Sequence, residues 1–161
     1  MNWLFPFLIL GVILTIYLTE GTNVPREILD NNPGGIRDMT GNAGWVGQQG
    51  TDGKNFVQFD TPTNGIRALC LNLLHKQEID GKQTLNTIFA GYSTDQPDPW
   101  YANNILGFLL NNGYAPITID SPISVRNNMD LFCRAVIHNE LTINPYPDSI
   151  IQAGEQAALI A

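Results

Sequence analysis

One carboxylate stands out by its position: Glu140 ends an apolar stripe on a predicted helix that begins at Ser121. Ser121 is a good N-cap, and Pro122 suits the first helical position, where a missing N–H costs nothing. At about 100° per residue, Glu140 falls on the same side of the helix as the stripe, so we expect it to point toward the core. The stripe consists of Val125, Met129, Phe132 and Val136, at spacings of four, three and four.

A glutamate directed toward the core suggests acid–base chemistry. Burial penalises the charged form and raises the pKa, which yields a carboxylic acid able to donate a proton near neutral pH. The alternative is that Glu140 turns out to solvent where the helix frays and has no chemical role.

The composition indicates one domain without affinity for nucleic acid. The chain has 161 residues, enough to bury a core, and a formal net charge of −7 with eight Lys and Arg residues. No basic run is visible, so nucleic acid is not an expected partner. His75 and His138 have no cluster at ligand spacing, so we expect no metal or other cofactor. Cys70 and Cys133 either pair or remain small buried hydrophobes.

The N-terminus is predicted to anchor the chain in a membrane. Residues 3–18, WLFPFLILGVILTIYL, carry no charge, and with Thr19 they approach the roughly 17 residues that cross a bilayer. A cleaved secretory signal is the alternative, but a basic n-region is absent and Thr19-Glu20-Gly21 is a poor cleavage site. We therefore expect residues 1–20 to form a single-pass anchor, with the lipid bilayer as the partner of residues 3–19. Its orientation stays open.

A Gly-rich segment opens the predicted domain. Its glycines, with Asn and Asp between them, indicate turns and short strands. Ile36–Met39 and Phe56–Phe59 are expected to pair as a hairpin. Thr61 and Pro62 then begin a helix through an N-cap and a first-turn proline. The apolar face of that helix is Ile66, Leu69, Cys70, Leu73 and Leu74.

The sequence predicts short helices in much of the remaining chain. Residues 21–30 are a predicted linker, and residues 31–161 are the predicted domain. Thr84–Tyr92 and Pro99–Asn112 each have an apolar face, and Gly113 is suited to end the second of these helices. The expected fold class is therefore α+β, mostly α.

Three stretches together resemble a family of phage virion proteins. NNPGGIR (31–37), then Trp45 with Gly47-Gln48, then FVQFDTPTNGIRAL (56–69) are close to the family's NNPGNIR, W-x-GQ and FAVFDSPExGIRAL. RAVIHNE (134–140) resembles its RAIIRHE without a gap, which places the family's glutamate on Glu140. Segment 101–120 and the tail from Tyr146 have counterparts too, so the resemblance spans roughly residues 31–158.

Three departures from the family pattern lie near the motifs. Gly35 stands where the family has Asn, Asn139 where it has His, and Leu141-Thr142 where it has Asn-Gly. The last two flank Glu140. The hydrogen-bond partners of its carboxyl group are therefore expected to differ from those in the family.

The hairpin-then-helix order is also similar to bacterial glucosaminidases of the lysozyme superfamily. The resemblance implies a lysozyme-like helical domain with a small β-hairpin, its parts in permuted order because the Glu helix comes last. Together with the predicted anchor, the resemblance implies a membrane-anchored virion enzyme, held in an internal virion membrane, that degrades peptidoglycan as the phage enters its host. Its expected partners are peptidoglycan glycan strands and other virion proteins.

The reaction implied by this resemblance depends on the number of carboxylates. A lytic transglycosylase route needs only Glu140, first as acid and then as base on the sugar's own hydroxyl. A hydrolase needs a second carboxylate, for which Asp38 and Asp52 are available, although both also suit turns. Side chains that could bind a sugar polymer are Asn31, Asn32, Trp45, Gln48, Gln58, Tyr92, Trp100 and Tyr101, with core packing as the alternative for each aromatic.

Two functions from different classes thus stay open. The first is the muralytic enzyme. The second is a non-catalytic structural virion membrane protein, or a glycan-binding module, on the same fold. An open cleft with Glu140 at its base, near the hairpin, would favour the enzyme, and a filled cleft would favour the module.

Overall fold

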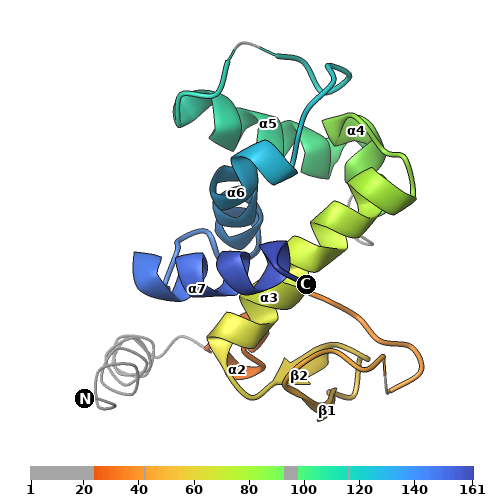
Figure 1. Cartoon of the computed structure of the whole chain (residues 1–161), viewed down its shortest axis with the longest axis vertical. Coiled ribbons are helices and arrows are strands. Elements are labelled where there is room, and N and C mark those ends of the chain that lie inside the picture. The colour runs from red at the N-terminus through yellow and green to blue at the C-terminus, as the bar shows by residue number, and fades with distance from the viewer. Residues whose placement is uncertain (1–23, 42, 93–97, 116) are drawn as a thin grey trace.

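The computed structural model describes residues 24–41, 43–92, 98–115 and 117–161 (Figure 1). The predicted membrane anchor, residues 1–20, lies outside them. None of the helices within these ranges is long and apolar enough to cross a bilayer. In chain order the main elements are α2 (Arg26–Leu29), β1 (Gln48–Thr51), β2 (Val57–Phe59), α3 (Pro62–Leu74), α4 (Leu85–Ile88), α5 (Trp100–Asn111), α6 (Met129–Leu141) and α7 (Asp148–Leu159).

The described part of the chain is mixed α+β and mostly helical, as predicted. In Figure 1 the helices α3, α6 and α7 gather in the middle, α4 and α5 lie at one end, and α2 lies with the hairpin at the other. The turn α2 belongs to the fold because Ile28 is buried and Asp30 accepts a hydrogen bond from the N–H of Phe59 through its backbone carbonyl. The folded part therefore begins before residue 31, within the predicted linker.

The hairpin differs from the predicted one in its first strand. β2 pairs antiparallel with β1, from Gln48 opposite Phe59 to Thr51 opposite Val57, and not with a strand at 36–39. That segment makes only an isolated bridge between Arg37 and Phe56. It cannot extend further because the Asp38 carboxylate accepts the N–H groups of the residues that follow and folds them into a turn.

Helix α3 begins as predicted. The Thr61 hydroxyl accepts a hydrogen bond from the N–H of Asn64, and Pro62 occupies the first turn. Gly65 lets this helix approach the chain closely, since a Cβ there would lie 1.8 Å from the carbonyl oxygen of Asn31. The predicted apolar face is buried in full: Ile66, Leu69, Cys70, Leu73 and Leu74.

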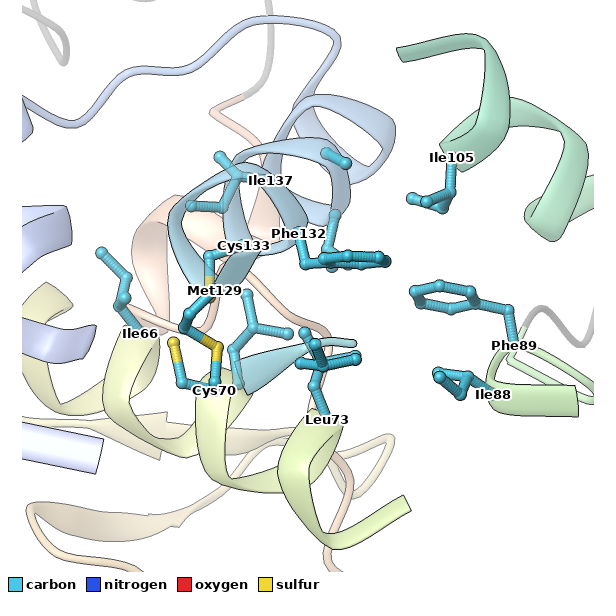
Figure 2. Packing of buried hydrophobic residues seen from close by; sticks show 14 of the residues in the cluster. Ile66, Cys70, Leu73, Ile88, Phe89, Ile105, Met129, Phe132, Cys133 and Ile137 are labelled. Atoms are coloured by element: carbon cyan, nitrogen blue, oxygen red, sulfur yellow. The ribbon is translucent and has the colours of Figure 1, made fainter. Parts of the chain in front are cut away.

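The core lies where α3, α4, α5 and α6 meet. Figure 2 shows Cys70 and Leu73 of α3 facing Met129 and Cys133 of α6, with Phe89 and Phe132 directed toward one another. Both cysteines are buried free thiols, and burial raises the pKa of Cys133 well above its ordinary value. They therefore act as small core residues in this structure.

Helix α6 begins later than predicted, at Met129, after a 3-10 turn at Arg126–Asn128. The backbone of 123–125 is held by a buried side chain of the π-helical turn His75–Ile79. Gln77 donates to the carbonyl of Ile123 and accepts from the N–H of Val125. Ser121 is not an N-cap, because its hydroxyl accepts from the N–H of Thr118. The predicted stripe is nevertheless buried: Val125, Met129, Phe132 and Val136.

Helices α4 and α5 agree with their predictions to different degrees. α4 is one turn, shorter than the predicted Thr84–Tyr92, and its N-terminus is fixed by a reciprocal capping box between Thr84 and Thr87. α5 matches its prediction closely, with Asn112 as C-cap followed by Gly113 at a φ of 84°.

Candidate functional site

A cleft of about 450 Å³ separates the N-terminal segment and hairpin from the helices. The hairpin side carries three basic residues, two glycines and a phenylalanine. The helical side carries three aromatic residues and the end of α6, including Glu140. The lining residues are Arg26, Gly34, Gly35, Arg37, Lys54, Phe56, Tyr92, Trp100, Tyr101, Asn139 and Glu140.

Glu140 is half-buried in the wall of this cleft, at the last turn of α6. The Tyr101 hydroxyl donates to its Oε1 at 2.6 Å. Burial raises the pKa of Glu140, and the charge of Glu27 adds to this, while the Tyr101 hydrogen bond and the charge of Arg26 oppose it. Glu140 was predicted to point toward the core; it is partly buried and lines the cleft, and burial makes its carboxyl group bind a proton more readily than that of an exposed glutamate.

Tyr101 is held rigidly by neighbouring rings. It stacks on Phe89 with ring centroids 5.3 Å apart and contacts Tyr92 at 4.7 Å. Tyr92 in turn donates from its hydroxyl to the carbonyl of Gly34 at 3.2 Å, which joins the two sides of the cleft. Burial, reinforced by the charge of Glu140, raises the pKa of Tyr101 well above its ordinary value, so Tyr101 remains a hydroxyl donor.

The second carboxylate oxygen of Glu140 faces Gly35. A Cβ built on Gly35 would lie 3.7 Å from Oε2, and the φ of Gly35 is +58°. Glycine adopts this conformation without strain and leaves the space beside Oε2 open. A reacting oxygen atom therefore has access to the unshared side of the carboxyl group.

Neither of the two predicted partner carboxylates lines the cleft. Asp38 is buried and accepts from Thr40, Ala43 and Gln48, and these hydrogen bonds hold its pKa far below the ordinary value. Asp52 accepts from the N–H groups of Lys54 and Phe56, and its pKa is also lowered. Both are turn-forming residues. Of the described residues that line the cleft, Glu140 alone is acidic.

Four of the eight predicted sugar-binding residues reach the cleft region. Tyr92, Trp100 and Tyr101 line the cleft itself, and Trp100 is 42% exposed at its rim. Trp45 lines an adjoining hollow of about 270 Å³ that also contains Gly34, Gly35 and Tyr92.

The four predicted amides have structural roles instead. Asn32 is 1% exposed and bonds to the backbone of Ile36 and Val57. Asn31 donates to the carbonyl of Phe59. Gln48 and Gln58 donate to Asp38 and Asp30, respectively. Amides in a Gly-rich segment can bind its backbone and its carboxylates as well as a ligand, and here they bind the backbone and carboxylates.

The sequence reasoning missed the basic residues of the cleft. Arg26, Arg37 and Lys54 come from three separate segments, and the guanidinium groups of Arg26 and Arg37 lie over the ring of Phe56, at 3.2 and 4.3 Å from its centroid. Since no two of these basic residues are adjacent in the chain, the sequence contains no basic run that would indicate them. Their grouping around Phe56 exists only in the folded chain.

The cleft continues into a groove between α5 and α6. This groove has a volume of about 720 Å³ and shares Trp100 and Asn139 with the cleft. Its floor and walls are rich in uncharged amides, and Asn104 donates to Asn139 across it at 3.0 Å. Amides and an exposed aromatic ring are suited to the hydroxyl groups and apolar faces of sugars. The remaining amides along the groove are Asn103, Asn111 and Asn112.

Within the described ranges, no group of three or more His, Cys, Asp or Glu side chains is arranged to hold a metal ion. Comparison with known proteins found neither a matching protein-family model nor a significant match among curated proteins.

Proposed function

We propose that this protein cleaves the glycan strand of peptidoglycan by a lytic transglycosylase reaction, on a lysozyme-like fold, with Glu140 as acid and base. The observation that carries the proposal is one protonatable carboxyl group in an open cleft beside the hairpin. The resemblance of its sequence to phage virion proteins gives the substrate class. The amide-lined groove beyond Trp100 and Asn139 supports a polymer as the ligand, because it lengthens the cleft.

The proposed reaction has two proton transfers. Protonated Glu140 gives its proton to the glycosidic oxygen as the bond to the anomeric carbon breaks, which leaves an oxocarbenium-like sugar. The ionised carboxylate then takes the proton from the 6-hydroxyl of that same sugar, whose oxygen bonds to the anomeric carbon. The products are a 1,6-anhydro sugar end and a free hydroxyl on the other fragment, and Glu140 regains its proton.

The surroundings of Glu140 suit both transfers. Burial favours the protonated form needed first, and the Tyr101 hydrogen bond stabilises the carboxylate needed second. The open space beside Oε2 admits the sugar oxygen. Hydrolysis would need a second carboxylate to position water, and Asp38 and Asp52 are both engaged in turns. This favours transglycosylation.

The cellular setting is also a proposal. Residues 3–19 would anchor the domain in the virion's membrane, and the cleft would meet peptidoglycan as the phage enters its host. The alternative function is a non-catalytic glycan-binding or structural module. The open cleft favours the enzyme, whereas the changed residues at 139 and 141–142 favour the module.

The decisive experiment incubates the full-length chain, in mild detergent, with purified peptidoglycan. The same measurement is made on the test variant Glu140→Gln and on the matched control Glu155→Gln. Glu155 is a suitable control because it is a second carboxyl group with a raised pKa, near 7, and does not line the cleft. Mass spectrometry of the released fragments should find 1,6-anhydro ends with the wild type and Glu155→Gln, and none with Glu140→Gln.

Other outcomes separate the alternatives. Reducing ends released by the wild type would mean a hydrolase and would direct attention to Glu27, whose charge acts on Glu140. No release, or equal release from the wild type and Glu140→Gln, would refute catalysis by Glu140 and favour the module.

A further inference from the structure

The cleft is basic although the chain is acidic. The whole chain has a formal net charge of −7 and only eight Lys and Arg residues, yet three of these eight line the cleft. A fourth, Lys76, lines the adjoining hollow beside Trp45. Because like charges repel, three cations that line one cleft of an acidic protein call for an explanation.

The positive charge of this wall is only partly neutralised. Arg26 forms an ion pair with Glu27. Arg37 and Lys54 are exposed, and neither forms an ion pair with any residue that the structure describes. The Lys54 ammonium group acts on Asp52 through charge at longer range, while the backbone N–H of Lys54 donates to the same carboxylate. Two cations on the hairpin side are thus available to a ligand.

The ring of Phe56 orders this wall. Phe56 is 7% exposed, and the guanidinium groups of Arg26 and Arg37 both lie over its ring at the cleft. A guanidinium group held in one orientation loses less entropy when it binds a planar anion through two parallel hydrogen bonds. A carboxylate is a planar anion of this kind.

We propose that Arg37 and Lys54 bind carboxylates carried by the side groups of the glycan strand, so that the cleft selects anionic peptidoglycan over a neutral sugar polymer. The inference rests on the proposed function and adds the specificity of the same site. The N-acetyl sugar backbone is uncharged, so a cationic wall gains nothing from it. Carboxylates are supplied either by the stem peptide or, where that is removed, by the lactyl group on the muramic acid.

A binding measurement tests this without cleavage. Isothermal titration calorimetry would measure the affinity of the full-length Glu140→Gln variant for three tetrasaccharides. The first contains muramic acid with its stem peptides, the second contains muramic acid without stem peptides, and the third is the neutral tetrasaccharide of N-acetylglucosamine. Arg37→Gln and Lys54→Gln would be added to this background. Lys82→Gln is the matched control, because Lys82 lies outside the cleft and its nearest carboxylate is Asp80 at 4.0 Å.

The neutral ligand should bind more weakly than an anionic one by about two- to fivefold for each cation engaged, the range expected of exposed ion pairs. Arg37→Gln and Lys54→Gln should each reduce this preference, and Lys82→Gln should not. The preference should vanish near 1 M salt, where the screening length is about 3 Å. Preference for either anionic tetrasaccharide supports the proposal, and the comparison between the two identifies which carboxylate is bound.

Equal binding of the neutral and anionic ligands, or a preference that survives both substitutions, would overturn the inference. Such a result would leave the proposed reaction intact if the wild type still releases anhydro sugars. Conversely, selective binding without any release would refute the reaction and retain the selectivity in a binding module.

Discussion

The Tyr101 hydroxyl donates to Oε1 of Glu140 at 2.6 Å and thereby joins the first turn of α5 to the last turn of α6. The hydrogen bond favours the ionised carboxylate and opposes the larger effect of burial. The protonation of Glu140 thus depends on a residue from another helix, 39 positions away in the sequence.

Replacing Tyr101 with Phe should raise the pKa of Glu140 further, because the group that stabilises the carboxylate is removed. Glu140 would remain protonated to higher pH, so the alkaline limb of the pH–rate profile should shift to higher pH. Stability should fall by about 0.5–1.5 kcal/mol. Tyr92→Phe is the matched control, since it removes a hydroxyl that bonds to Gly34 and not to Glu140. An unmoved alkaline limb in Tyr101→Phe would contradict this account.

The helices of the fold could be predicted where local signals decide them. Thr61 and Pro62 fix the start of α3, and the apolar periodicity of α6 correctly predicted that Val136 is buried. The same periodicity predicted that Glu140 points toward the core, whereas Glu140 is partly buried and lines the cleft. The start of α6 could not be predicted in this way. Gln77, far away in the chain, binds the backbone at 123 and 125, and this contact overrides the N-cap signal of Ser121.

Residues singled out from the sequence, Glu140 and the aromatic residues, do line the cleft or its adjoining hollow, whereas the positive charge of the cleft was not predicted. Trp100 and Tyr101 lie in the first turn of a helix that the sequence predicts, whereas Arg37 and Lys54 line the same cleft only because the hairpin folds back. The amides of the Gly-rich segment were predicted to bind sugar, but they bind other groups of the protein for a physical reason. Tight turns leave backbone groups unpaired, and residues such as Asn32 satisfy them.

Gly35→Ala should reduce activity, because its methyl group enters the cleft, and should reduce stability, because its backbone conformation is strained. The positive φ makes any side chain cost about 1 kcal/mol or more, and the new methyl group would lie 3.7 Å from Oε2 of Glu140. Gly41→Ala is the matched control, with a φ of +76° and no atom within 4 Å of its Cβ. Denaturation should find both variants destabilised, while turnover falls only in Gly35→Ala. Similar activity in the two variants would argue against a reacting atom beside Oε2.

Trp100→Ala should weaken glycan binding with little change in stability. The ring is 42% exposed where the cleft meets the α5–α6 groove, so its removal deprives a sugar of a stacking surface. An aromatic contact of about 0.5–1.5 kcal/mol corresponds to a roughly two- to tenfold loss of affinity. Leu110→Ala is the matched control on the same helix, at 41% exposure and outside both hollows. Equal affinities of the two variants for glycan strands would remove Trp100 from the binding site.

Thr142→Gly should stabilise the fold. Thr142 ends α6 at a φ of 65°, a left-handed conformation that is strained for a β-branched side chain. Glycine relieves this strain but is more flexible in the unfolded chain, which offsets part of the gain. The free energy of unfolding should therefore rise by about 0.5–1 kcal/mol. Thr142→Ala retains a Cβ and should show no comparable gain. A chemical denaturation midpoint that fails to rise for Thr142→Gly would show that the surroundings already accommodate threonine.

Glu155→Gln should remove a pH dependence of stability that is unrelated to the cleft. Glu155 is 7% exposed, and its Oε1 makes no hydrogen bond to any described residue. Burial, with the charge of Asp130 next and that of Arg134 opposing, raises the pKa of Glu155 from about 4.5 to about 7. The folded state therefore holds this proton more tightly than the unfolded state, and the stability contributed by Glu155 is lost as pH rises through that interval.

Above pH 7 the amide introduced by Glu155→Gln stays neutral, whereas the wild type must bury a charge. The variant should thus be the more stable protein at pH 8, and the difference should shrink below pH 5. Glu78→Gln is the matched control of opposite sign, because Arg126 lowers the pKa of Glu78 and its removal should destabilise the fold at neutral pH. Unfolding free energies measured from pH 4 to pH 8 decide the matter: parallel curves for the wild type and Glu155→Gln would mean that Glu155 is solvated in the folded protein.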